Sequence, residues 1–436
     1  MTNRIVAMIR VCGVATARVA VSALLPALAL SGCGDIFSLE QENKGQLTAD
    51  AAYTPANAQL LVNGAIADFE CAYSRYITGS ALLGDELINA FSNTSSFDYD
   101  RRTLNLTSPY DGGCGGAQLP GIYTSLSTAR GTGDVAYEKL AGWTDAQVPN
   151  RARTMAQVAT YAGYSLLLLG EGFCTAAIDV GPELTQAQVF AEALNRFDKA
   201  IADATAASDV SILNMARLGR ARALLNTEEL ADAATAAAQI PADFVVNTSM
   251  DAVNTRRQNL IFLHLFQNFW SSVDPSYRDL TLEGAPDPRV VATSSGRSGT
   301  GTIIEVWQTS KYPAVTTPFP VARYAEAQLI IAEARAAAGD LTGAAAAINA
   351  ARNSGRTGMP QYDAAGQTAA QVRNQIIEER RRELFLEGRR FWDVQRFDLP
   401  LVPAPGSPYL TTGTYGDQRC FPLPAVERNN NPNLAG

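Results

Sequence analysis

Apolar and small residues recur at steps of three and four through much of the chain, the pattern of helices that bury one face. The first such stretch begins at Thr54, a residue suited to cap a helix, with Pro55 at the first helical position. A second predicted helix runs from about Ile122 to Leu140. Residues 91–118, between the two, are rich in Ser, Asn, Asp and Gly and are predicted to form a loop.

Predicted helical hairpins occupy about 154–241 and 321–397. Their helices are rich in alanine and glycine, which let neighbouring helices approach closely, and are joined by a loop or a short polar turn. Paired helices of this length are similar to tetratricopeptide repeats, which stack into an α–α superhelix. A generic alanine-rich helical protein is the alternative on these segments alone.

Residues 242–320 break the helical pattern. They contain six prolines, the run "SSGRSGTG" and the strand-like "TIIEVWQ". A long irregular insertion on a rigid scaffold is where binding residues usually lie. The predicted fold is therefore mainly α, with helical hairpins packed against a loop-rich region that has few short strands. The chain from about Asp398 is also proline-rich and is predicted to be non-helical.

The N-terminus has the pattern of an export signal. Three arginines and no acid accompany an apolar run at residues 19–30, which is too short to span a bilayer. The following "LSGC" resembles the lipobox of bacterial lipoproteins, which implies cleavage after residue 32 and lipid attachment to Cys33. Residues 1–32 are then a signal peptide, 33–50 a tether and 51–436 the folded domain. An ordinary signal with an accidental cysteine is the alternative.

Charge and composition narrow the classes of function. The chain is 47% hydrophobic, enough for a sizeable core, and carries a formal net charge of −8. An acidic chain repels phosphate backbones, so nucleic acid is not expected as a partner. No segment has eighteen uninterrupted apolar residues, so the protein is expected to be anchored to a membrane through lipid and not to span it.

Four cysteines follow the lipobox: Cys71, Cys114, Cys174 and Cys420. An even number in an exported protein predicts two disulfides, for which three connectivities exist. The pairing of Cys71 with Cys114 closes the shorter loop and is preferred, leaving Cys174 for Cys420. The sequence has no CxxC and no Cys/His cluster, so neither a metal site nor a cofactor is expected.

The segment "EERRRELFLEGRRFWDVQRFD", residues 378–398, contains six acids and six arginines. If the segment is one helix, Arg380, Glu383, Glu387 and Arg390 share a face, and neighbours of opposite charge can pair locally. The zero net charge argues against nucleic-acid binding. Each acid has an arginine within one turn, which holds it ionised and makes it a poor general acid. We therefore interpret the segment, with Trp392 in the core, as architecture that fixes helix docking.

This charged segment resembles the signature of SusD/RagB-type outer-membrane lipoproteins, ERRxELxxEGxRxxDxxR. Two further segments agree with that family, "RYAEAQLIIAEARAAAG" at 323–339 and "CFPLPAVERNNNPNL" at 420–434. Together with the lipobox and "GIYTSLSTARGTGDVAYEKL" at 121–140, the resemblance spans nearly the whole chain after the signal. The chain departs from the family at "STARGTGD", where an asparagine is typical, and no substrate can be transferred by motif.

The resemblance implies four tetratricopeptide-like hairpins, a loop-rich binding region and no catalysis. It also implies a lipoprotein at the surface of the outer membrane, acting with a SusC-like TonB-dependent transporter. Its ligands would be oligosaccharides, or peptides in some branches. The alternatives are a surface glycoside hydrolase, which needs a carboxylate pair in a cleft, and a repeat scaffold that binds only a protein partner.

Sugar binding needs aromatic faces and polar side chains. In related proteins these come from the loop after the first helix and from the irregular insertion. We therefore expect ligand contacts within about 91–118 and 242–320. The candidates are Asn93, Phe97, Tyr99, Trp270, Tyr277 and Tyr312. Trp307, in the apolar strand, and His264 are expected to be structural.

Overall fold

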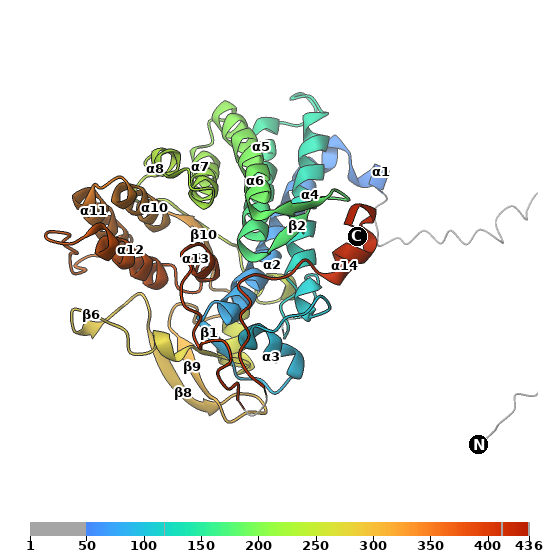
Figure 1. Ribbon diagram of the computed structural model, residues 1–436. Coiled ribbons are helices and arrows are strands. Elements are labelled where there is room, and N and C mark those ends of the chain that lie inside the picture. Colours follow the sequence, from blue (N-terminus) through green and yellow to red (C-terminus); the bar gives the residue numbers. More distant parts are fainter. Residues whose placement is uncertain (1–48, 117, 411–412, 435–436) are drawn as a thin grey trace, which may run out of the picture. The chain divides into compact units, whose positions relative to one another are not determined.

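A computed structural model describes residues 49–116, 118–410 and 413–434. Cys33, the signal peptide and nearly all of the tether lie outside these residues. The described chain is mainly helical, with five two-stranded antiparallel sheets (Figure 1). The prediction of a mainly α fold with few short strands is confirmed.

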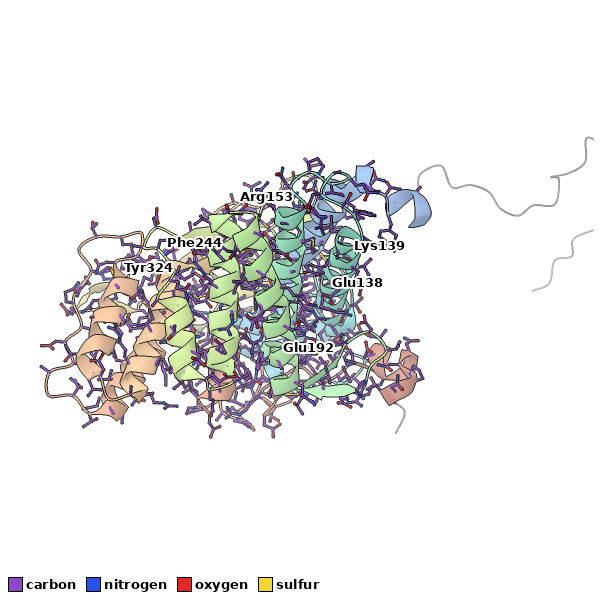
Figure 2. The ribbon with its side chains drawn as sticks, turned by 90° about the horizontal axis from the view of Figure 1, so that it is seen from above. Glu138, Lys139, Arg153, Glu192, Phe244 and Tyr324 are labelled. Carbon is purple, nitrogen blue, oxygen red and sulfur yellow. A yellow bond between two sulfur atoms is a disulfide. The ribbon has the colours of Figure 1, made fainter. Side chains whose placement is uncertain are left out.

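The longer helices are α2 (Ala58–Leu83), α4 (Tyr123–Ala141), α5 (Arg151–Gly172), α6 (Gln186–Ala206), α7 (Val210–Asn226), α8 (Leu230–Ala237), α10 (Tyr324–Ala337), α11 (Leu341–Arg352) and α12 (Ala369–Glu383). Shorter helices are α1 (Ala49–Ala52), α3 (Thr94–Arg101), α9 (Leu260–Phe262), α13 (Arg390–Arg396) and α14 (Ala425–Asn430), with a π-helical turn, η4, at Leu263–Gln267. Seen from above, α4 to α7 and then α10 and α11 lie side by side in a row (Figure 2).

Small residues allow the close packing of this row. Phe197 of α6 lies between Gly163 of α5 and Gly219 of α7, where an added Cβ would come within 2.8 Å and 2.3 Å of its ring. Alanine at either position would therefore force the ring to move. The short turns between hairpin helices use left-handed residues, such as Ser208 before α7 and Gly339 before α11.

Most of the strands belong to the loop-rich part. The strands are β1 (Leu87–Asn89), β2 (Thr175–Ala177), β3 (Glu183–Thr185), β4 (Val245–Asn247), β5 (Ser271–Val273), β6 (Thr281–Leu282), β7 (Ala285–Pro286), β8 (Ala292–Ser298), β9 (Glu305–Thr309) and β10 (Pro320–Arg323). Of these, β2 and β3 lie between α5 and α6. The pairs are β1–β5, β2–β3, β4–β10, β6–β7 and β8–β9. Next to the β4–β10 pair, the Tyr324 N–H donates to the Phe244 carbonyl at 2.9 Å. Figure 2 shows these two residues side by side, so the insertion begins and ends against α10.

Two disulfides tie the loop-rich part to the helices. Cys71 of α2 is joined to Cys114, and Cys174, just after α5, is joined to Cys420. This is the pairing preferred from the sequence. The second bridge links positions 246 residues apart, and the Cys174 N–H also donates to the Phe421 carbonyl at 2.9 Å.

Two stretches predicted to lack helices contain short ones. Helix α3 begins inside the expected loop 91–118, because the Asn93 side chain accepts a hydrogen bond from the Ser95 N–H and caps it. Helix α14 interrupts the proline-rich C-terminal part after Pro424, which ends the preceding extended chain.

The prediction of one continuous helix through the charged segment is wrong. Helix α12 ends at Glu383 and α13 begins at Arg390. Between them Leu386 and Gly388 have φ angles of 53° and 73°. A Cβ on Gly388 would also lie 3.1 Å from the Tyr76 ring, so glycine suits this turn on two counts.

The predicted local ion pairs are also wrong, because the turn moves Glu387 and Arg390 off the α12 face. Arg380 bonds to Asp393, while Glu383 accepts from Arg323 and Arg356. Glu387 accepts from Lys311 and Arg323, and Arg390 binds Asp85 in a bidentate pair. Trp392 is 8% exposed and its indole N–H donates to Asn226 at 2.9 Å. The segment thus connects distant elements, consistent with its interpretation as architecture.

Candidate functional site

Three of the six candidate ligand residues are core side chains. Tyr99 and Tyr277 have no exposed surface and Tyr312 is 1% exposed. The hydroxyl of Tyr99 donates to the Pro120 carbonyl and that of Tyr312 to the Leu386 carbonyl. Tyr277 stacks on Phe385 with ring centroids 4.7 Å apart. The expectation that these three rings contact a ligand does not fit their burial: Tyr277 and Tyr312 pack against the charged segment, and Tyr99, in α3, packs against Phe421.

Asn93 and Phe97 are half-buried at the start and in the middle of α3. The side-chain oxygen Oδ1 of Asn93 accepts the capping hydrogen bond from the Ser95 N–H. The Phe97 ring packs on Tyr409, with centroids 5.7 Å apart, and the Arg101 guanidinium lies over the same tyrosine. Phe97 therefore belongs to a small aromatic and cationic group that α3 shares with the C-terminal loop.

Three loops converge next to α3. The Ala90 N–H, after β1, donates to the Trp270 carbonyl, and the Ser92 N–H donates to the Thr300 carbonyl in the β8–β9 connection. The Thr300 N–H in turn donates to the Phe269 carbonyl. These hydrogen bonds hold three segments against one another: the loop after β1, the segment that follows η4, and the tip of the β8–β9 hairpin.

Gly299 is required for this convergence. A Cβ at this position would lie 1.9 Å from the Ala90 carbonyl oxygen. That distance is far below any contact that a real side chain makes, so only glycine lets the hairpin tip reach the loop after β1.

Trp270 is half-buried on this surface, packed against the rings of Phe91 and His264 with centroids 5.6 Å and 5.3 Å away. His264 is buried and its Nδ1 lies 3.0 Å from the Ser271 hydroxyl, in keeping with a structural role. The neighbouring Phe269 ring carries the exposed Arg297 guanidinium 4.2 Å from its centroid. Phe269 and Arg297 were missed in the sequence.

Trp307 is half-buried and does not lie wholly in the core, contrary to the expectation. Arg278 stacks over its ring at 4.9 Å, and its indole N–H donates to Glu305 at 3.3 Å. In β9 its neighbour Val306 is buried, and so is Thr309 at the end of the strand. Strand alternation places Val306 and Trp307 on opposite faces, and that signal could have predicted the exposed side.

We name the set Asn93, Phe97, Phe269, Trp270, Arg297 and Trp307 the loop face. Its residues come from α3 and its cap, from the segment between η4 and β5, and from β8 and β9. The labelled elements α3, β8 and β9 lie in the lower part of Figure 1. Its partly exposed rings are accompanied by a guanidinium and a carboxamide, which suits stacking and hydrogen bonding to a polar ring. Nowhere in the described part of the chain do three or more His, Cys, Asp or Glu side chains gather so as to hold a metal ion.

Two buried carboxyl groups lie under β1. Burial raises the pKa of Glu86 to about 8 and that of Asp100 to about 7. One Glu86 oxygen accepts from the Leu386 N–H at 2.6 Å, while Asp100 accepts from the Asn89 N–H at 2.8 Å. Glu86 is therefore largely protonated at neutral pH and connects β1 with the turn between α12 and α13.

Glu86→Gln is expected to flatten the loss of stability at alkaline pH. The folded chain holds a proton on Glu86 up to about pH 8, whereas an unfolded glutamate releases it near pH 4. Stability from this group is thus fully present below about pH 4 and is lost as pH rises through 8. Glutamine mimics the neutral form, so at pH 9 the variant should be more stable than the wild type by about 1–3 kcal/mol. Denaturant unfolding at pH 5.5 and 9 measures this; an equal pH dependence would contradict it.

The architecture is shared with solved structures. A SusD superfamily protein from Bacteroides fragilis aligns with a TM-score of 0.63 and 16% identity, over 88% of this chain and 99% of its own. A SusD-like carbohydrate binding protein from Bacteroides vulgatus aligns at 0.60 and 16%, over 88% and 97%. The surface glycan-binding protein A from Bacteroides fluxus aligns at 0.61 and 13%, over 87% and 98%. At these identities the likeness shows the fold. No curated protein sequence matches the chain.

A sequence model described as the SusD family matches residues 294–435. Over residues 294–435 the chain matches the SusD family by sequence, and its described fold is that of solved SusD-like proteins. The matched range begins in β8 and includes Arg380, Glu383, Glu387 and Arg390 of the charged segment, so it contains much of the buried charge network. In residues 49–116, 118–410 and 413–434, no helix combines the length and apolar character needed to cross a bilayer.

Proposed function

We propose that this SusD-like protein binds glycans at the loop face without turning them over. The observation that carries the proposal is the convergence of three loops, which bring partly exposed aromatic rings together with Arg297 and Asn93. Aromatic faces stack on the apolar side of sugar rings, and the polar groups bond to hydroxyls. Two proteins of the same fold, described as carbohydrate-binding and glycan-binding, support the same ligand class.

We further propose that the protein is a lipoprotein of the outer membrane, anchored through Cys33 and facing outward. Its partner would be a SusC-like TonB-dependent transporter, to which it hands the captured ligand. The "LSGC" motif and the family support this location. Peptides are the second ligand class to be tested, since some branches of the family bind them.

A glycan and peptide array with the purified full chain tests the proposal. Trp307→Ala and Phe269→Ala should each weaken binding of the selected glycan about tenfold or more, because each removes a stacking surface. Tyr53→Ala is the matched control, since Tyr53 is also partly exposed and also carries a cation, Lys139, 5.0 Å from its ring centroid. Its affinity should equal that of the wild type.

The same measurements separate the alternatives. Turnover of a bound glycan would identify a glycoside hydrolase. Binding of no glycan or peptide, with capture of a protein partner, would favour a scaffold. Equal affinity in all three variants would show that the loop face is not the site.

A further inference from the structure

A pocket that contains no loop-face residue lies beside the end of α12. It has a volume of about 380 Å³ and is lined by residues of β10, of the end of α12, and of the segments after β7, β9 and α11. Its lining residues are Pro288, Arg289, Ser310, Lys311, Pro320, Arg323, Arg356, Glu383 and Glu387. We name it the Lys311 pocket. Four of its side chains are cationic and two are carboxylates.

The cationic excess persists when the neighbours of the pocket are counted. Arg289 also pairs with Asp287 and Glu379. Glu379 pairs with Arg352, and Asp287 with Arg382. The connected set contains six cations (Arg289, Lys311, Arg323, Arg352, Arg356 and Arg382) and four carboxylates (Asp287, Glu379, Glu383 and Glu387). Adding Glu378 and Arg381, which pair with each other, leaves the excess of two unchanged.

The other buried ion-pair clusters of this segment are balanced. Arg222 and Arg389 face Glu171 and Glu326. Arg380 and Arg396 face Asp393 and Glu333. Arg390 and Asp85 form a single pair. Glu86, the remaining nearby acid, adds little negative charge at neutral pH, because burial raises its pKa to about 8. Among the ion-pair clusters that involve this segment, only the Lys311 pocket has a positive excess, in a chain whose net charge is −8.

Donors remain at the rim of the pocket. Arg356 uses Nη2 on Glu383 and Nε on the Arg352 carbonyl, while Nη1 makes no hydrogen bond to any described residue. Lys311 Nζ donates to Glu387 at 2.7 Å and to the Phe385 carbonyl at 2.6 Å. An ammonium has three protons, so the third can donate to a ligand. The Ser310 hydroxyl makes no hydrogen bond within the described chain either.

These donors are held in place and reach solvent. The side chains of Arg356 and Lys311 are 27% and 22% exposed. Arg323 joins their positions, since it bonds to both Glu383 and Glu387. Burial, followed by the opposing effects of Glu387 and Arg323, leaves the pKa of Lys311 below its ordinary value. An anion beside this ammonium would favour its charged form.

We propose that the Lys311 pocket binds a compact oxyanion, a carboxylate or sulfate group, through Arg356, Lys311 and Ser310. Fixed cationic donors pair with such groups by short, charge-assisted hydrogen bonds. The group is either a free anion or the acidic substituent of a sugar. The Lys311 pocket shares no residue with the loop face. Neutral glycans would bind at the loop face and not in the Lys311 pocket.

Calorimetric titration of the full chain with sulfate, galacturonate and galactose, at constant ionic strength, tests the proposal. Sulfate or galacturonate should show saturable binding and galactose none at this site. Arg356→Gln and Ser310→Asp should each lower the affinity about tenfold or more, by removing a donor and by adding a negative charge. Arg335→Gln is the matched control: this exposed arginine of α10 has one distant carboxylate, 3.9 Å away, and its loss should change nothing.

Ser310→Asp keeps the test decisive if Arg356→Gln unfolds, because Ser310 is exposed and its hydroxyl is unbonded within the described chain. Galacturonate bound at least tenfold more tightly than sulfate assigns the group to an acidic sugar, and the reverse order assigns it to a free anion. Absence of saturable binding of both anions, or binding that survives both substitutions, would overturn the proposal. Neither result bears on neutral glycans at the loop face.

Discussion

Glu383→Ala is expected to lower the free energy of unfolding by about 3–5 kcal/mol, because it leaves buried arginines without their shared partner. The carboxylate is 3% exposed and accepts from Arg323 at 2.7 Å and from Arg356 at 2.5 and 2.6 Å. Arg289 lies 3.7 Å away. Alanine removes all three interactions and leaves the buried Arg289 and the largely buried Arg323 with one carboxylate fewer. Urea unfolding followed by circular dichroism measures the loss.

Glu378→Ala is the matched control on the same helix. Its side chain is 34% exposed and pairs with Arg381 and Arg382 one turn away. Such exposed local pairs contribute less than about 1 kcal/mol. The folded fraction of the Glu383 variant should bind glycans as the wild type does. Equal destabilisation by the two substitutions, or a selective loss of glycan affinity, would contradict the architectural role.

The sequence predicted that the charged segment is architectural, but not how its charges pair. Helical spacing correctly predicted that Arg380 and Glu383 share a helix, α12. The prediction failed where it extended this helix and so placed Glu387 and Arg390 on the same face. The left-handed turn at Gly388 ends that register. A glycine inside a charged helical pattern is a visible signal for a turn. The partners Asp85 and Arg323, by contrast, are set by tertiary packing and have no local signal.

The loop face was only partly predictable for a related reason. Alternation in β9 shows that Val306 and Trp307 face opposite ways, so the exposed side of Trp307 could have been found. Tyr277 and Tyr312 lie in irregular chain, where no period tells buried from exposed positions. Their place under the charged segment depends on how the insertion folds back. Gly299 is one of several glycines in its segment of the sequence. Only the folded structure, which places the Ala90 carbonyl beside it, shows that glycine is required there.

The helical part followed more directly from the sequence, because its signals are local. The predicted second helix, Ile122 to Leu140, corresponds to α4, and the hairpin segments correspond to α5–α8 and α10–α13. Alanine and glycine along these helices predicted the close packing around Phe197. Helix α3 was missed because its cap, Asn93, stands in a polar stretch that also resembles a loop.

Replacing Cys174 and Cys420 together by alanine is expected to cost about 2–5 kcal/mol of stability. In the chain-entropy account the cost grows with the loop that the bridge closes, and this bridge spans 246 residues. It also lies beside a cluster of rings, with Phe173 and Phe421 centroids 5.3 Å apart and the Phe421 N–H donating to the Gly172 carbonyl. The C-terminal segment around Cys420 and Phe421 should therefore detach first from α5 when the variant is heated.

Cys71 and Cys114, replaced in the same way, provide the comparison. This bridge spans 43 residues, so loop entropy predicts a cost smaller by about 1.5 kcal/mol. Thermal unfolding of both double variants and the wild type, with and without a reductant, shows which of the two disulfides contributes more to stability. The reductant should lower the melting temperature of the wild type and further lower that of each variant, which keeps one bridge. The chain-entropy argument fails if the short-loop variant is the less stable of the two, since burial of Cys71 in α2 would then outweigh loop length.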